Sequence, residues 1–427
     1  MPLCVAVLAI FLLPWSTWAA TPLAKPAVRV RLDGLGYRAL PPKMLSTAFS
    51  LQTLNFIDDD HILLTYNERK LIPRQPDDLP EQDLRLVRAI VVHISTGKVE
   101  AETEWREYDH GQYLWPMRDG QFLFRRKNTL YVFHPGGHLH EKGDGAGAFD
   151  MHVLFSTEDS LESVRLSPNG GLLIVQTSRG KRIGDDPEED SNEKKIQIVF
   201  FEIDVASGVV MLRQIGRSET SHVVGISSNA RGMLTVSNDG RSRWGFDYRG
   251  FTGGSRDLAA LESSCTPQPV FISESEFLAF GCRGGEELNE MGGFDLLGNA
   301  LWLTTVETPM WAIFESALRG GRFAYRTTAG PIVVDDSDSS SRVQIVHVYS
   351  NGSGEEILRA ACSPVQRMGQ NFALSTDGRK LAVLHDGAIE VFTLPALTAK
   401  EEEAMRKASQ AAAQGELTPQ ESMRETK

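Results

Sequence analysis

Cysteine and long basic runs are both scarce in this sequence. The 427 residues contain only four cysteines, too few for a fold that depends on many disulfides. Acidic residues outnumber basic ones, 56 against 44, and the formal net charge is −12. A negative field of this kind repels polyanions at a distance. We therefore expect no nucleic-acid partner and no attraction to anionic lipid headgroups.

Signatures of catalysis are also missing. The sequence has no Gly-x-Ser-x-Gly nucleophile elbow and no Gly-x-x-x-x-Gly-Lys-Ser/Thr loop for nucleotide phosphates. We expect a binding protein that is not an enzyme and carries no cofactor. The alternative is a secreted lyase or hydrolase with its site in a central channel, where scattered carboxylates and histidines can converge without leaving a local motif.

The N-terminus holds an apolar run that is too short to cross a bilayer. Residues 2–13 are almost wholly apolar, and small residues follow at Thr17 and Ala19. This pattern suits a signal peptide cleaved after Ala19, although a charged segment before the run is missing. A buried N-terminal strand is the alternative. We predict a signal peptide over residues 1–19 and a periplasmic or secreted monomer without membrane contact.

Tight-turn dipeptides recur along the chain between short apolar runs. The clearest stretch, residues 374–392, has two of them, Asp377-Gly378 and Asp386-Gly387. Both residue types tolerate positive φ, as hairpin turns require, and the flanking runs have the length and composition of strands. Asn169-Gly170 and Asp119-Gly120 begin similar units. We find seven copies, spaced roughly 40 to 70 residues apart, near the period of propeller blades.

The units at residues 166–175 and 374–383 resemble the blade motif of bacterial WD40-like propellers of the TolB type. The resemblance implies an all-β propeller, and the seven copies predict a seven-bladed β-propeller of four-stranded antiparallel sheets. That motif belongs to the architecture and carries no catalytic residue.

The seven units predict a domain plan. We expect an extended segment over residues 20–45, the propeller over 46–397, and a tail over 398–427 that is helical at Ala399–Ala413 and partly disordered beyond. The last unit lacks a fourth strand, so an N-terminal segment should close the ring and remove its free edge. Val28–Leu32 and Lys43–Leu51 are the two candidates.

Three insertions lie between the second and third strands of their units, at Glu68–Leu84, Arg179–Glu193 and Asp335–Arg342. All three should emerge on one face of the disc, and we expect a protein or peptide partner there. Acidic residues at 184–190 and 335–338 favour a basic partner, although solvated loops without a ligand are the simpler interpretation. The candidate binding rim on that face comprises His110, Tyr113, His222, Glu307 and Arg367. Tyr113, Trp115 and Trp311 could instead pack between sheets.

Two side-chain groups remain. Cys265 and Cys282 flank one predicted hairpin symmetrically, so folding it brings them within disulfide reach in an oxidising compartment; two buried thiols are the alternative. We expect Cys362, left without a partner, to be buried.

His134, His138 and His140, with Glu141, have the composition of a zinc site, but histidine on an outer hairpin is more often a plain polar residue. We predict no metal there.

Overall fold

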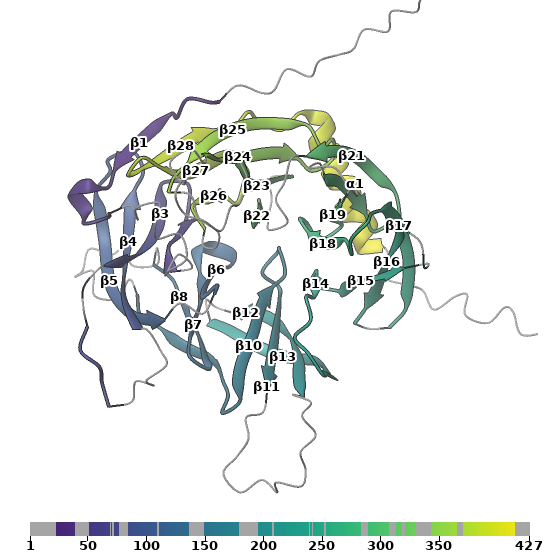
Figure 1. Cartoon of the computed structure of the whole chain (residues 1–427), viewed down its shortest axis with the longest axis horizontal. Coiled ribbons are helices and arrows are strands. Elements are labelled where there is room, and N and C mark those ends of the chain that lie inside the picture. Colours follow the sequence, from purple (N-terminus) through teal and green to yellow (C-terminus); the bar gives the residue numbers. More distant parts are fainter. Residues whose placement is uncertain are drawn as a thin grey trace, which may run out of the picture.

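The computed structural model is a ring of seven antiparallel sheets of four strands each, with one α-helix in the part of the chain that the structure describes (Figure 1). The seven-bladed β-propeller predicted from the sequence is confirmed. The structure describes residues 23–38, 51–68, 70, 72–76, 84–108, 111–135, 149–178, 195–206, 209–238, 240, 242–251, 253–282, 289–306, 313–317, 321–329, 343–364 and 370–414. Among these residues, the structure contains no helix with both the length and the apolar character needed to span a bilayer.

The first four sheets follow one another along the chain, and their strands pair in sequence order. The first contains β2 (Thr53–Phe56), β3 (His61–Glu68), β4 (Leu84–His93) and β5 (Val99–Tyr108). The second contains β6 (Leu114–Pro116), β7 (Phe122–Arg126), β8 (Thr129–Phe133) and β9 (His152–Ser156). The third contains β10 (Ser160–Leu166), β11 (Leu172–Ser178), β12 (Ile196–Ala206) and β13 (Val209–Thr220), and the fourth β14 (Ser227–Ser228), β15 (Gly232–Asn238), β16 (Arg243–Gly250) and β17 (Ser255–Glu262).

The last three sheets complete the ring. The fifth contains β18 (Gln268–Phe271), β19 (Glu276–Cys282), β20 (Asn289–Asp295) and β21 (Ala300–Val306). The sixth contains β22 (Ile313–Ser316), β23 (Arg322–Ala329), β24 (Val343–Ser350) and β25 (Glu356–Cys362). The seventh is made of β26 (Phe372–Leu374), β27 (Lys380–His385), β28 (Ala388–Thr393) and, from the other end of the chain, β1 (Val28–Arg31).

The turn chemistry of the sequence sets the hairpins. Asp386 and Gly387 both have positive φ, 47° and 68°, the combination of a type I′ turn that matches the twist of the flanking strands. The same conformation appears at Asp119 and Gly120, with φ of 56° and 72°. These turns fix the register of their strands, since a two-residue loop leaves little freedom in pairing.

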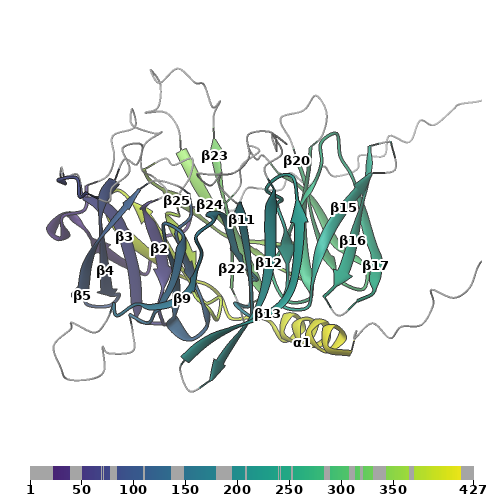
Figure 2. The same cartoon turned by 90° about the horizontal axis from the view of Figure 1, so that it is seen from below.

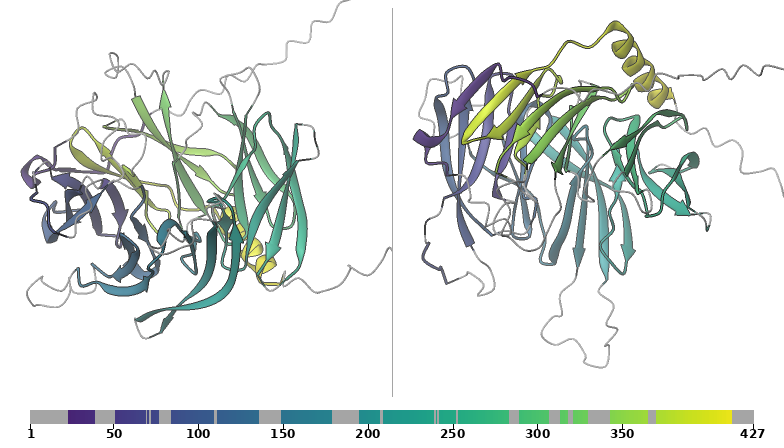
Figure 3. Two further views of the ribbon diagram at one scale, coloured as in Figure 1. Left: turned by 60° about the horizontal axis from the view of Figure 1, so that its bottom comes forward. Right: turned by 45° about the horizontal axis from the view of Figure 1, so that its top comes forward.

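Strand β1 closes the ring. Val28 pairs with Val391 and Arg31 with Ala388, in antiparallel register. Figure 3 shows the purple N-terminal strand beside the yellow-green strands of the last sheet. Of the two candidate donors, Val28–Leu32 is correct and Lys43–Leu51 is wrong, because the seventh sheet takes its fourth strand from β1. Closure pairs the outer edge of β28, which would otherwise expose unpaired backbone groups.

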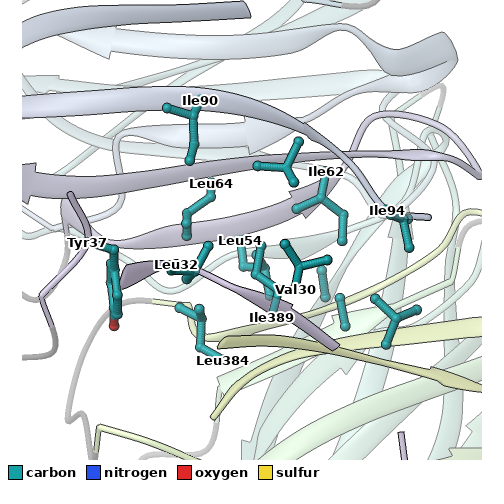
Figure 4. Packing of buried hydrophobic residues seen from close by; sticks show 14 of the residues in the cluster. Val30, Leu32, Tyr37, Leu54, Ile62, Leu64, Ile90, Ile94, Leu384 and Ile389 are labelled. Atoms are coloured by element: carbon teal, nitrogen blue, oxygen red, sulfur yellow. The ribbon is translucent and has the colours of Figure 1, made fainter. Parts of the chain in front are cut away.

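The core is divided into seven hydrophobic clusters, each between two neighbouring sheets. Figure 4 shows the cluster that joins the last sheet to the first, where Val30 and Ile389 meet Leu54 and Ile62. Trp115 is buried between the second and third sheets, which confirms that it packs between sheets. Trp311 lies outside the described residues.

Helix α1 (Ala399–Gln414) confirms the helix expected at Ala399–Ala413. A capping box begins it: the Thr398 hydroxyl accepts from Glu401 N–H at 3.3 Å, and Thr398 N–H donates to the Glu401 carboxylate at 2.7 Å. Gly321, with φ of 55°, leaves room for Met405, which a Cβ at that position would strike. Figure 2 shows α1 along one side of the disc.

Candidate functional site

The two faces of the disc differ in what joins the strands. The first and second strands of each sheet, and the third and fourth strands of the first six sheets, are connected on one face, which we call the turn face. The second and third strands, and successive sheets, are connected on the opposite loop-bearing face. Each insertion connects a second strand to a third, and the ends of the flanking strands lie on the loop-bearing face. Most of their residues lie outside the described ones.

A pocket opens on the loop-bearing face between the first and second sheets, with a volume of about 320 Å³. The ends of β5 and β7 and the starts of β4 and β8 form it, together with one residue of the first insertion. The lining residues are Gln75, Leu84, Arg106, Glu107, Tyr108, Arg126, Lys127, Thr129 and Tyr131. The pocket is polar, and three of its four charged lining residues are cationic, which distinguishes it from the apolar packing between the sheets below.

Alternation along β5 brings an acid into this pocket. Ala101, Trp105 and Glu107 are buried while Glu102 and Glu104 are exposed, as expected for side chains that alternate across a strand. Trp105 packs on Phe124 of the second sheet with ring centroids 4.6 Å apart. Glu107 is therefore the last inward-facing residue of the strand, where the apolar core meets the pocket. Its side chain is 1% exposed.

The surroundings of Glu107 hold its carboxyl group mostly protonated at neutral pH. Burial raises the pKa of Glu107 to about 8, and the positive charge of Arg126 opposes this shift most. Arg126 Nε lies 3.7 Å from Glu107 Oε1, and among the described residues that oxygen has no hydrogen-bond partner. With Glu107 protonated, the charges that line the pocket are the positive ones of Arg106, Arg126 and Lys127, so the pocket favours an anionic group.

Arg125 supports the pocket from below and does not line it. Its side chain is buried, and it donates to the Lys127 carbonyl at 3.3 Å and to the Leu161 carbonyl of the third sheet. Burial lowers the pKa of Arg125. These bonds hold the β7–β8 turn, and with it Arg126 and Lys127, against the next sheet.

The predicted rim residues do not form one group among the described residues. Tyr113 is fully buried, and its hydroxyl lies 2.7 Å from Thr65 Oγ1 and donates to the Leu51 carbonyl at 3.0 Å. It is a packing residue between the first two sheets and does not reach the rim surface. His222 is exposed on the loop-bearing face, with its Nδ1 3.2 Å from Ser221 Oγ. His110, Glu307 and Arg367 lie outside the described residues.

In the sixth sheet, a hydroxyl, an imidazole and a carboxylate are joined in that order by buried hydrogen bonds. Thr327 Oγ1 lies 2.9 Å from His347 Nε2, and His347 Nδ1 lies 2.6 Å from Glu356 Oε1. This is the order of a nucleophile, a base and the group that orients the base. However, Thr327 and His347 are buried, and the imidazole stacks on Tyr325 with centroids 5.2 Å apart. We interpret the chain as internal hydrogen bonding, because a nucleophile needs access to substrate.

The cysteines follow the predicted pattern. Cys265 and Cys282 are joined by a disulfide with a Cα–Cα distance of 5.5 Å. The Ser263 hydroxyl accepts from both of their backbone N–H groups, at 3.2 and 2.9 Å. Cys362 is free and buried, as expected, and burial raises the pKa of its thiol to about 12. It is therefore unreactive at neutral pH.

The histidine group at residues 134–140 is only partly described. His134 donates from Nε2 to the Asp119 carbonyl at 2.7 Å, which occupies that nitrogen. His138, His140 and Glu141 lie outside the described residues. The prediction that no metal binds there stays a prediction.

Comparison with known proteins yields similarity of fold alone. No protein-family model matches the sequence, and no similar curated protein was found. A chain of the mitotic checkpoint complex aligns with 92% of this chain and 99% of its own, at 12% identity and a TM-score of 0.43. Acylaminoacyl peptidase from Pyrococcus horikoshii aligns at 10% identity and a TM-score of 0.45, over 87% of this chain and 56% of the peptidase. Sqt1 from Chaetomium thermophilum aligns at 12% identity and a TM-score of 0.40, over 82% of this chain and 96% of Sqt1.

Sequence reasoning missed the pocket and its acid. A signal for Glu107 was present, because the inward positions of β5 include Ala101 and Trp105 and then end on a carboxylate. An acid at an apolar position of an alternating strand is costly to bury and often marks a functional site. Arg126 and Lys127 come from another sheet, and no local pattern connects them to Glu107.

Proposed function

We propose that this protein is an exported, non-enzymatic binding module of the WD40-like, TolB type that holds a protein or peptide on its loop-bearing face. The observation that carries the proposal is the cationic pocket beside Glu107 on the face that also bears the three insertions. Loops and pockets on one face of a rigid scaffold are where such folds place recognition. Protein binding requires a complementary surface and no catalytic group, and the described residues include a polar pocket that could supply part of that surface.

The charge of the site defines the partner. Arg106, Arg126 and Lys127 favour an acidic side chain or a chain-terminal carboxylate in the pocket. The acidic stretches 184–190 and 335–338 belong to the loops on the same face and favour a basic surface opposite them. A partner that has an acidic group for the pocket and a basic surface next to it would complement both the pocket and the acidic loops. Electrostatic contacts of this kind weaken as salt screens them.

Export is the second half of the proposal. The apolar run at residues 2–13 supports it, and so does the disulfide between Cys265 and Cys282, since structural disulfides persist in oxidising compartments. N-terminal sequencing of the protein from the producing cell would test this, with Ala20 expected as the first residue.

The binding proposal is tested by capture from a cell-envelope extract, followed by affinity measurement with the purified partner. Replacing two of the three pocket cations, Arg126→Glu with Lys127→Glu, should weaken binding at least about tenfold. Replacing the three insertions by Asn-Gly turns should abolish it. Arg379→Glu is the matched control, because Arg379 is an exposed cation on the turn face. Capture of the same proteins by the pocket variant and by the loopless variant would contradict the proposal.

One observation favours the enzyme alternative. A carboxyl group with a pKa of about 8 in a pocket has the properties of a general acid or base. The sequence placed such a site in the central channel, whereas Glu107 lies between two sheets. If screening of lyase and hydrolase substrates finds turnover, and Glu107→Gln removes it while Glu104→Gln does not, the enzyme function replaces the binding one.

A further inference from the structure

Two histidines and a glutamate meet on the turn face of the first sheet, on the opposite side of the disc from the cationic pocket. His61 begins β3 and pairs across the strands with His93, the last residue of β4. Glu100 is the second residue of β5, just after the turn that follows β4. Neighbouring strands and one short turn therefore bring three potential metal ligands together.

Their donor atoms are close enough to bind one ion. One ligand atom from each of the three lies within 4.8 Å of the others. The two imidazole rings are nearly perpendicular, with centroids 5.1 Å apart and an interplanar angle of 86°, so they do not stack and both can direct a nitrogen toward a common point. His61 Nε2 lies 3.0 Å from Glu100 Oε2.

Asp58 orients the central ligand. Its two carboxylate oxygens lie 2.8 and 2.9 Å from His61 Nδ1, so Nδ1 carries the proton and donates. The same carboxylate accepts from the backbone N–H groups of Asp60 and His61, each at 2.8 Å, which fixes it in the β2–β3 turn. A carboxylate on the far nitrogen of a ligating histidine sets the tautomer and leaves the lone pair of Nε2 for a metal.

The surroundings of His61 are compatible with a bound cation. The His61 side chain is 8% exposed and faces a carboxylate at each nitrogen. A tetrahedral ion with bonds of about 2.0–2.2 Å would separate Nε2 and Oε2 by about 3.4 Å. Glu100 is 32% exposed and can move by the few tenths of an ångström required.

We propose that His61, His93 and Glu100 bind one zinc ion, with Asp58 holding His61 in place. Two imidazole nitrogens and one carboxylate suit Zn²⁺ and related divalent transition metals, whereas Ca²⁺ and Mg²⁺ require mainly oxygen ligands. The partial exposure of His93 and Glu100 leaves a fourth position for water. The ion would join the ends of β3, β4 and β5. This site is independent of the proposed binding function.

The test is titration of the untagged, metal-free protein with Zn²⁺ by calorimetry, and with Co²⁺ by visible absorption. We expect one site per chain. His93→Gln and Glu100→Gln should each weaken it at least about tenfold, and Asp58→Asn by about 10- to 100-fold. His61 is left unchanged because it is buried. His222→Gln, an exposed histidine on the other face, should have no effect.

A second measurement, the Tm with and without zinc, distinguishes a folding defect in a variant from the loss of a metal ligand. Saturating Zn²⁺ should raise the Tm of the wild-type protein, because a ligand that binds only the folded state stabilises it. The His93→Gln and Glu100→Gln variants should keep the metal-free Tm and lose the rise. The proposal is overturned if no stoichiometric site appears, or if the site persists in both variants. Loss of zinc binding in His134→Gln instead would assign the metal to the other histidine group.

Discussion

Replacing Glu107 with glutamine should stabilise the protein at alkaline pH. In the folded state burial raises the pKa of this carboxyl to about 8, from an ordinary value of 4.5. The folded protein therefore binds a proton that the unfolded chain releases between these two pH values. Stability from this group is complete below about pH 4.5 and is lost as the pH rises toward about 8. Glutamine has nearly the same shape as glutamate and never ionises, so the variant should not lose stability as the pH rises.

The magnitude follows from the two pKa values. Their difference corresponds to about 5 kcal/mol of unfolding free energy once the pH exceeds both. Water entering the pocket relaxes part of this cost. We expect the variant to exceed the wild type by about 2–5 kcal/mol at about pH 9, and by much less at about pH 5.

Urea unfolding followed by tryptophan fluorescence measures this difference at both pH values. Glu104→Gln is the control, because Glu104 lies on the same strand but is exposed, and its replacement should leave the pH dependence unchanged. An advantage of Glu107→Gln that does not grow between the two pH values would refute the reasoning. It would mean that the nearby cations already keep the carboxylate charged.

Two further predictions concern the ring itself. Deleting residues 21–32 removes buried Val30 and Leu32, worth about 1.5–3 kcal/mol each, and exposes the edge of β28. Light scattering should show aggregation, and a soluble monomer of unchanged Tm would contradict closure by β1. Cys265→Ser opens the disulfide to Cys282 over a sequence separation of 17 and should cost roughly 3 kcal/mol, seen as a lower Tm. Two free thiols in unreduced peptides of the wild type would show that no bridge forms.

The sequence was sufficient for the ring because its signals are local. Asp386-Gly387 and Asp119-Gly120 encode their turns within two residues, and both adopt the expected positive φ. The missing fourth strand of the last unit required a donor, and counting strands was enough to suggest one. Choosing Val28–Leu32 over Lys43–Leu51 was not possible, since either could supply a strand of suitable length.

The sites were harder to predict because they are made by pairing. His61 and His93 are far apart in sequence and become neighbours through the register of β3 and β4. Glu107 on the first sheet lies beside Arg126 on the second sheet. No spacing pattern along a single strand indicates this contact. Tyr113 was misplaced for the opposite reason. A tyrosine at the start of a unit can lie either on the rim or in the core. The contact of Tyr113 with Thr65 of the first sheet shows that it lies in the core.

Ring closure has a consequence for the order in which the protein is made. β1 is synthesised before the seven sheets, and its partner β28 after almost all of them. The growing chain therefore carries β1 unpaired while six sheets assemble, and the ring closes only when the last unit is complete. Contacts between such distant segments form slowly, and an unpaired edge is prone to aggregation meanwhile. If the protein crosses a membrane as an unfolded chain, β1 is again among the first segments to emerge and must wait for β28 on the far side. A chaperone that shields this strand would be most useful during that interval.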